Sequence, residues 1–309
     1  MVRGRTGHRA LSGLHRDRAP RGHLPLVYGD SCSRRGHRPH RAGLAASDKH
    51  RTRLISWPFD VTVYAGLVLL FFGHAWLTRG APDARRRHTL YFLAGLLTLW
   101  IALETPVDTI SDHYLDSVHM LQHVLLAFVA PPLMLLGLSP AMAARLVRVP
   151  GLRALTEPVQ AQVIAAVVMI VWHAPALYDA TLSNEGLHVL EHVMFVAAGI
   201  ALYWPIIEST SAQSRWHMSP GAKLVYMLLA TLPQDGVALA LIFSRVPFYD
   251  FYTHVPRLVA GFTALIDQTV AGAVLMIVGK VTLAIAALVV FFRWFGAEQA
   301  ADRQILGVR

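Results

Sequence analysis

The chain has 309 residues, of which 54% are hydrophobic and only 15% are charged. Soluble domains usually carry about 25% charged residues, so the composition excludes an ordinary soluble protein and favours a membrane protein. The formal net charge of +9 resides in residues 1–53, which hold 13 of the 28 Lys and Arg residues. The remainder is close to neutral, and the basic balance is therefore no evidence for nucleic-acid binding.

Residues 1–53 predict a disordered basic tail. The segment is rich in Arg, His, Gly and Pro, so it cannot bury enough apolar surface to offset the entropy of ordering. It has no apolar core of a secretory signal peptide, and a start codon assigned too far upstream would also account for it. The single cysteine, Cys32, lies here. Disulfides and thiolate metal sites are therefore excluded from the rest of the chain.

Seven apolar stretches follow the tail, each close to the roughly 20 residues that a helix needs to cross a bilayer. They predict an all-α bundle of about seven transmembrane helices within residues 54–296, followed by a short cytoplasmic tail at 297–309. The predicted spans are about 57–77, 89–104, 117–137, 159–174, 186–207, 222–243 and 267–293.

Lys and Arg in the short loops predict the orientation, because cytoplasmic loops are enriched in these residues. The loops after the first, third and fifth spans and the C-terminus carry bases, whereas 105–116 and 175–185 carry acids and no base. This pattern places the C-terminus in the cytoplasm and the start of the first span outside. The basic tail contradicts this orientation, and so do Arg245 and Arg257 in the last outer loop.

Prolines and tryptophans mark irregular points and ends of the spans. Pro131 and Pro132 predict a kink in the third span. Tryptophans at span ends are typical of the aromatic belt at the membrane interface, and the candidates here are Trp57, Trp76, Trp204 and Trp294.

The histidines outside the tail gather at one end of the predicted third, fourth and fifth spans. His119 and His123 are four residues apart, as are His188 and His192, so each pair lies on one helix face. His173 ends the fourth span. Because the chain reverses direction at every crossing, all five reach the same face, which is the outer one. Neutral imidazole binds copper, zinc, iron and nickel, so the sequence predicts a metal site there.

Acidic residues near the same end predict partners that hold the second ring nitrogen of each imidazole. We expect Asp235 among them, because Pro233 should break the sixth span in its outer half and broken helices often line a cavity. Lys280, near the middle of the seventh span, is expected to pair with Asp235 or another acid, or to extend toward the interface. The full set of expected carboxylate partners is Asp112, Asp116, Glu191, Asp235 and Asp267.

The segments around the histidines resemble a known family. They are SVHMLQH at 117–123 running into APPLMLLG at 130–137, HAPALYD at 173–179, LHVLEH at 187–192 running into YWPI at 203–206, and DQ at 267–268. Over about residues 57–293 the chain resembles the caa3-type cytochrome c oxidase assembly factors, CtaG of the Bacillus kind. Lys280 and the basic tail are not features of that pattern.

The resemblance implies a seven-span protein of the bacterial plasma membrane that helps to make functional cytochrome oxidase. Its implied partners are the oxidase subunits and the lipid bilayer, and its implied cargo is copper. The ligands implied for that copper are His119, His123, His173, His188 and His192.

Three functions remain open at this stage. The leading hypothesis is a copper chaperone that assists assembly without catalysing a reaction. A zinc-dependent membrane hydrolase, with three histidines on the metal and an acid activating water, is the enzymatic alternative. A haem or quinone redox protein, with His123 and His192 as axial ligands, is the third.

Overall fold

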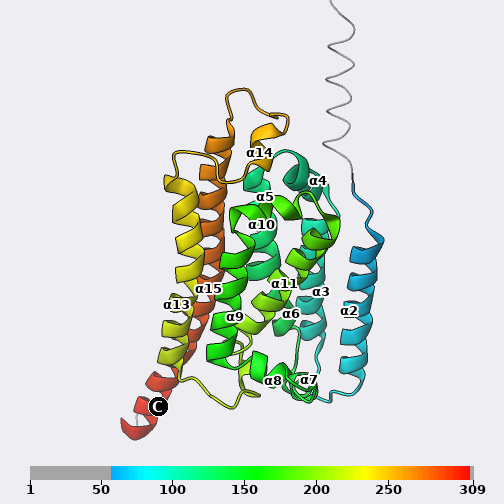
Figure 1. Cartoon of the computed structure of the whole chain (residues 1–309). Coiled ribbons are helices and arrows are strands. Elements are labelled where there is room, and N and C mark those ends of the chain that lie inside the picture. The colour runs from blue at the N-terminus through cyan, green and yellow to red at the C-terminus, as the bar shows by residue number, and fades with distance from the viewer. Residues whose placement is uncertain (1–56, 307–309) are drawn as a thin grey trace, which may run out of the picture. The chain divides into compact units, whose positions relative to one another are not determined.

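The computed structural model describes residues 57–306, and these form helices joined by loops (Figure 1). The described part contains no strand, so the all-α prediction is confirmed. The predicted tail at 1–53, with Cys32, lies outside the described residues.

Five helical stretches of the described chain are long and apolar enough to cross a membrane, and two bent helix pairs raise this number to seven. The prediction of about seven spans agrees with this range. The five stretches are α2 (Val61–Arg79), Asp116–Leu136, α11 (Glu185–Tyr203), α13 (Pro220–Phe243) and α15 (Ala264–Leu306). The bent pairs are α3 (Arg86–Leu103) with α4 (Pro106–His113), at 43°, and α9 (Pro158–Trp172) with α10 (Pro175–Thr181), at 78°.

Both predicted acidic loops, 105–116 and 175–185, contain a short helix. Each helix starts with a proline, Pro106 in α4 and Pro175 in α10, whose fixed φ suits a first helical position. The hydroxyl of Thr105 also accepts the N–H of Val107 and caps α4. The two helices lie at the same end of the bundle as α14 (Phe251–His254) (Figure 1).

The third span combines three helical segments: α5 (Asp116–Val124), the π-helical turn η1 (Leu125–Val129) and α6 (Ala130–Leu136). Pro131 and Pro132 follow the π-helical turn after one residue, Ala130. Neither proline has an N–H to donate, so the carbonyls four residues earlier lose their usual partners and the preceding turn widens. The irregularity predicted at these prolines therefore takes the form of a π-helix.

Glycines allow the neighbouring helices to approach the third span backbone to backbone. A Cβ atom on Gly199 of α11 would lie 2.2 Å from the carbonyl oxygen of Ala127. A Cβ on Gly95 of α3 would lie 2.6 Å from Cγ of Met134 and 3.1 Å from the carbonyl oxygen of Ala130. Small residues at such crossings are typical of packed membrane helices. The third span is thereby held at the centre of the bundle.

Two expectations from the sequence, the break at Pro233 and the interfacial place of Trp204, are corrected here. Pro233 does not break the sixth span, because α13 runs continuously from Pro220 to Phe243 and loses only the one hydrogen bond that a proline removes. Trp204 is buried, whereas Trp57, Trp76 and Trp294 are exposed. The Trp204 side chain belongs to the same buried apolar cluster as Leu202 and Tyr203 at the end of α11. The predicted C-terminal tail is helical as far as residue 306.

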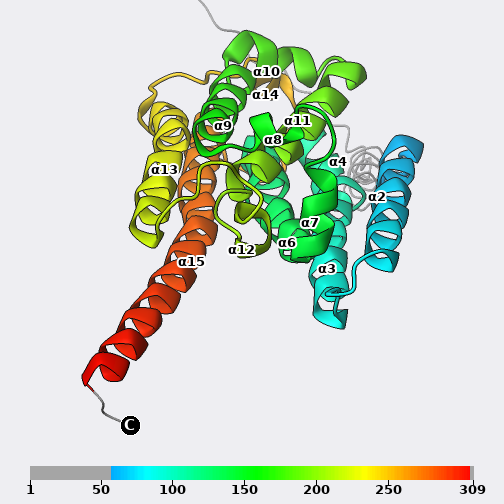
Figure 2. The same cartoon turned by 90° about the horizontal axis from the view of Figure 1, so that it is seen from below.

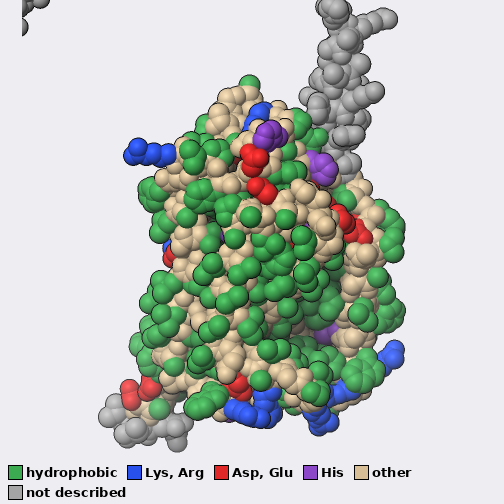
Figure 3. All heavy atoms as spheres, viewed as in Figure 1, with side chains coloured by type: hydrophobic (Ala, Val, Ile, Leu, Met, Phe, Trp, Pro, Cys, Tyr) green, Lys and Arg blue, Asp and Glu red, His purple; other side chains and the backbone are tan. Residues whose placement is uncertain are grey.

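The two ends of the helix bundle differ in charge. Arginines cluster at the end formed by α7 (Pro140–Leu146), α8 (Leu152–Leu155) and α12 (Glu208–Ser211). Lys and Arg side chains colour this lower edge in Figure 3. The end formed by α4, α10 and α14 lies opposite (Figures 1 and 3). Positive charge is therefore concentrated at one end of the long axis of the bundle.

Candidate metal centre

The structure brings all five predicted histidines into one buried cluster at the end that carries α4, α10 and α14. On α5, Nε2 of His119 lies 2.8 Å from Nε2 of His123. On α11, the rings of His188 and His192 have their centroids 4.2 Å apart. The two helices approach each other at His119 and His188, whose ring centroids are 5.6 Å apart. His173, the residue that follows α9, has its ring centroid 5.3 Å from that of His123.

Four groups within this cluster form a compact donor set. The ligand atoms of His119, His188, Glu191 and His192 all lie within 4.8 Å of one another. Three imidazoles and one carboxylate are a common ligand set for a transition metal. Glu191, expected as an outer partner, is placed among the donors because it follows His188 by three residues on the same face of α11.

His123 and His173 lie immediately beside the compact set. Nε2 of His123 is 3.4 Å from a carboxylate oxygen of Glu191. Nδ1 of His173 lies 2.7 Å from the carbonyl oxygen of Met169, which can only accept a hydrogen bond. In a neutral ring the proton is therefore on Nδ1, and the lone pair on Nε2 faces the cluster.

Each of the five histidines keeps one buried ring nitrogen without a hydrogen-bond partner among the described residues. An unpaired buried polar atom costs about 1–3 kcal/mol, so five in one place need a common explanation. Coordination of a metal ion by these nitrogens supplies one, and the residues present fit such an ion. The atoms are Nδ1 of His119 and His123, and Nε2 of His173, His188 and His192.

Asp112 lies between the two histidine-bearing helices. From α4, one of its carboxylate oxygens is 3.9 Å from Nδ1 of His119 and the other is 3.6 Å from Nδ1 of His188. At His188 the carboxylate lies by Nδ1 and leaves the unpaired Nε2 for an ion, as an outer partner in a metal site does, whereas at His119 it lies beside the unpaired Nδ1 itself.

Asp116 and Asp267 act on α5 rather than on the imidazoles. The carboxylate of Asp267, at the start of α15, accepts the backbone N–H of Asp116 at 2.9 Å and that of Ser117 at 3.0 Å. It therefore caps the first turn of the helix that carries His119 and His123. Asp116 in turn accepts the Tyr178 hydroxyl at 2.7 Å.

Asp235 lies apart from the histidines and pairs with Lys280, with 2.9 Å between the carboxylate oxygen and Nζ. The expected pairing of Lys280 is thereby confirmed. The expected place of Asp235 beside the histidines is not found, because α13 stays helical through Pro233 and presents Asp235 to α15.

Three tyrosines border the histidine cluster, and none of them was predicted as a site residue. The Tyr178 ring lies 5.0 Å from that of His119 and stacks on Tyr249 at 3.7 Å. The Tyr249 hydroxyl donates to the carbonyl of His173, and that of Tyr252 donates to the carbonyl of Ser111. Burial raises the pKa of Tyr249 and of Tyr252 well above the usual value, so both phenols remain donors at neutral pH. Of the three, only Tyr178 could have been noticed in the sequence, because it lies in the segment HAPALYD that resembles the family.

Loss of the Asp267 carboxylate should weaken the fold at this site. In Asp267→Asn one oxygen still accepts a hydrogen bond, but the new amide NH₂ group faces a backbone N–H. We expect the free energy of unfolding to fall by about 1–3 kcal/mol, as for a lost hydrogen bond to a charged group. Thermal unfolding of the detergent-purified protein measures this. Asp302→Asn, exposed on the same helix, is the control, and equal stability of both variants would contradict the capping role.

Fold and site together define a helical membrane protein with a buried imidazole and carboxylate cluster near one end of its bundle. A family model for the cytochrome c oxidase caa3 assembly factors matches residues 68–297. The chain belongs to that family, which confirms the resemblance seen in its histidine segments. Comparisons with curated proteins and with solved structures give no match.

Proposed function

We propose that this assembly factor binds copper at the histidine cluster and passes it to the oxidase during assembly. The observation that carries the proposal is the set of five unpartnered, buried imidazole nitrogens from three helices. Copper stands at the top of the affinity order for nitrogen ligands among the divalent first-row metals. The family supplies the connection to an oxidase that contains copper.

The residues of the cluster divide into two groups with different roles in this proposal. His119, His188, Glu191 and His192 hold the ion, because their donor atoms already lie within 4.8 Å of one another. His123 and His173 offer further nitrogens beside this set. An ion can then exchange ligands one at a time on its way to a partner, without losing all of its donors at once.

The proposal places the cluster at the outer face of the plasma membrane. Arginines concentrate at the opposite end of the bundle, and short loops rich in Lys and Arg are retained in the cytoplasm. Copper would then reach the site from outside the cell.

A gene deletion tests the function in the cell. The deletion strain should lose most of its cytochrome c oxidase activity, and added copper should restore part of it, because excess copper bypasses a delivery step. A plasmid copy carrying His119→Ala and His192→Ala should behave like the deletion. His113→Ala, exposed on α4, is the matched control and should restore full activity. Full activity from the double variant at wild-type protein level would refute copper delivery by this cluster.

A zinc-dependent membrane hydrolase is the second candidate, because three histidines with one carboxylate also suit catalytic zinc. Metal analysis of the purified protein separates the two: about one zinc per chain, with hydrolysis of a lipid amide, would favour the enzyme. The geometry disfavours a haem between His123 and His192. Nε2 of His123, the usual haem ligand atom of a histidine, lies 2.8 Å from Nε2 of His119 and 3.4 Å from a carboxylate oxygen of Glu191.

A further inference from the structure

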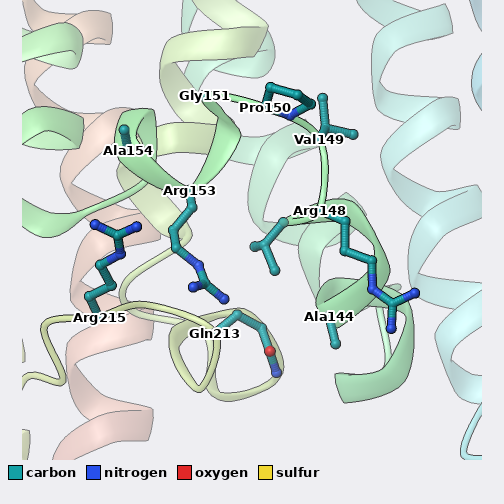
Figure 4. Close-up of a pocket in the computed structure, with 10 residues that line it drawn as sticks. Ala144, Arg148, Val149, Pro150, Gly151, Arg153, Ala154, Gln213 and Arg215 are labelled. Carbon is teal, nitrogen blue, oxygen red and sulfur yellow. The ribbon is translucent and has the colours of Figure 1, made fainter.

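A second polar site lies at the basic end of the bundle, away from the histidine cluster. A cavity of about 540 Å³ opens between the end of α7, α8 and the loop after α12. Figure 4 shows Arg148, Arg153 and Arg215 around it, with the Arg153 side chain extending toward Gln213. No acidic residue lines the cavity. We call these three arginines with Gln213 the arginine pocket.

The guanidinium groups of the arginine pocket have no acidic partner within the described part of the chain. None of the three forms an ion pair there, and Nε of Arg153 is buried without a hydrogen-bond partner. Glu157, next to α8, forms no ion pair with a guanidinium group, because its two carboxylate oxygens accept the backbone N–H groups of Arg215 and Trp216, at 2.8 and 3.1 Å. The described residues that line the cavity therefore include three positive charges and no carboxylate.

The donors of the arginine pocket suit one chemical class of ligand. Guanidinium groups bind phosphate oxygens in a two-pronged geometry, and the Gln213 amide adds a neutral donor. Basic pockets on the cytoplasmic side of membrane proteins bind anionic lipid headgroups. The volume lies within the range of small-ligand sites, roughly 300–1,000 Å³. Exposed Trp216 and Val149 border the arginines, as expected where a site meets lipid.

We propose that the arginine pocket binds a phosphate group, either in the headgroup of an anionic phospholipid or as the free anion. The binding anchors the loop after α12 to α8. This function is independent of copper binding, because no residue of the pocket belongs to the histidine cluster.

The test compares lipid and free phosphate on the full-length protein in detergent. Native mass spectrometry measures retained phosphatidylglycerol and, as the neutral comparison, phosphatidylcholine; equilibrium dialysis measures inorganic phosphate. We expect Arg153→Gln and Arg215→Gln each to lower binding of the phosphate-bearing probe about tenfold, the factor for losing a hydrogen bond to a charged group. Arg87→Gln, exposed in the first turn of α3 at the same end, should leave binding unchanged.

Arg215→Gln keeps the test sound if Arg153→Gln fails to fold, because the fold uses only the backbone N–H of Arg215. Loss of phosphatidylglycerol in the variants assigns a lipid headgroup, and loss of inorganic phosphate assigns the free anion. Both results support the site. Unchanged binding of phosphatidylglycerol and of inorganic phosphate in both variants would overturn it. Copper content measured in parallel should stay at the wild-type level, which separates this proposal from copper delivery.

Discussion

Replacement of His119 or His192 by alanine should abolish stoichiometric copper binding. Both residues belong to the compact set whose ligand atoms lie within 4.8 Å, and both keep an unpartnered buried nitrogen. Loss of an outer partner of a metal site already costs roughly 10–100-fold in affinity, so loss of a direct ligand should cost about hundredfold or more. Copper content after purification, and titration against a competing chelator, measure the effect.

The same measurement should rank the histidines. His123→Ala should weaken copper binding less than His119→Ala, because His123 lies beside the compact set and not within it. His113→Ala is the matched control and should bind copper like the wild type, since its side chain is exposed. Wild-type copper content in both His119→Ala and His192→Ala, in protein that unfolds at the same temperature, would rule out the assigned site.

Replacement of Gly199 by leucine should disrupt the bundle and the site together. The first added carbon would lie 2.2 Å from the Ala127 carbonyl oxygen and 2.6 Å from Cγ of Pro131. Neither neighbour can move like a flexible side chain, so α11 must shift away from η1. We expect a loss of about 3 kcal/mol or more in the free energy of unfolding, at the upper end for overpacked cores. Thermal unfolding in detergent measures it.

A glycine without neighbours provides the comparison for Gly199. Gly66 on α2 has no atom within 4 Å of an added Cβ. Gly66→Ala should therefore leave stability unchanged or raise it slightly, since alanine is the better helix former. Copper affinity should fall in Gly199→Leu, because α11 carries three of the four compact donors. Unfolding of Gly199→Leu at the wild-type temperature would contradict the close crossing.

Much of the fold follows from hydropathy and from the helical repeat. Apolar stretches near the length of a span place the membrane helices, and spacing of four residues places His119 with His123 and His188 with His192 on shared faces. Reversal of the chain at each crossing then brings His173 to the same end. Each of these rules considers one helix at a time, and together they are enough to bring all five histidines to the same end of the bundle.

The remaining features depend on contacts between helices, which a single helix pattern does not encode. The placement of Glu191 among the donors requires the distance from α11 to α5. Asp235 carries the same side chain as Asp112, but it faces α15 and Lys280 instead of the histidines. The π-helical turn before Pro131 is a local response to two adjacent prolines whose form sequence rules do not specify. Burial of Trp204 depends on its packing in the apolar core of the bundle.

The position of Asp267 on α15 has a consequence for the order in which the protein matures. Helix α15 follows all the other described helices in the chain, yet the Asp267 carboxylate caps the first turn of α5, more than 140 residues earlier. A nascent chain that stops short of α15 therefore exposes uncapped N–H groups beside His119. The helix that carries His119 and His123 therefore gains its cap only after α15 has been made and has packed beside it.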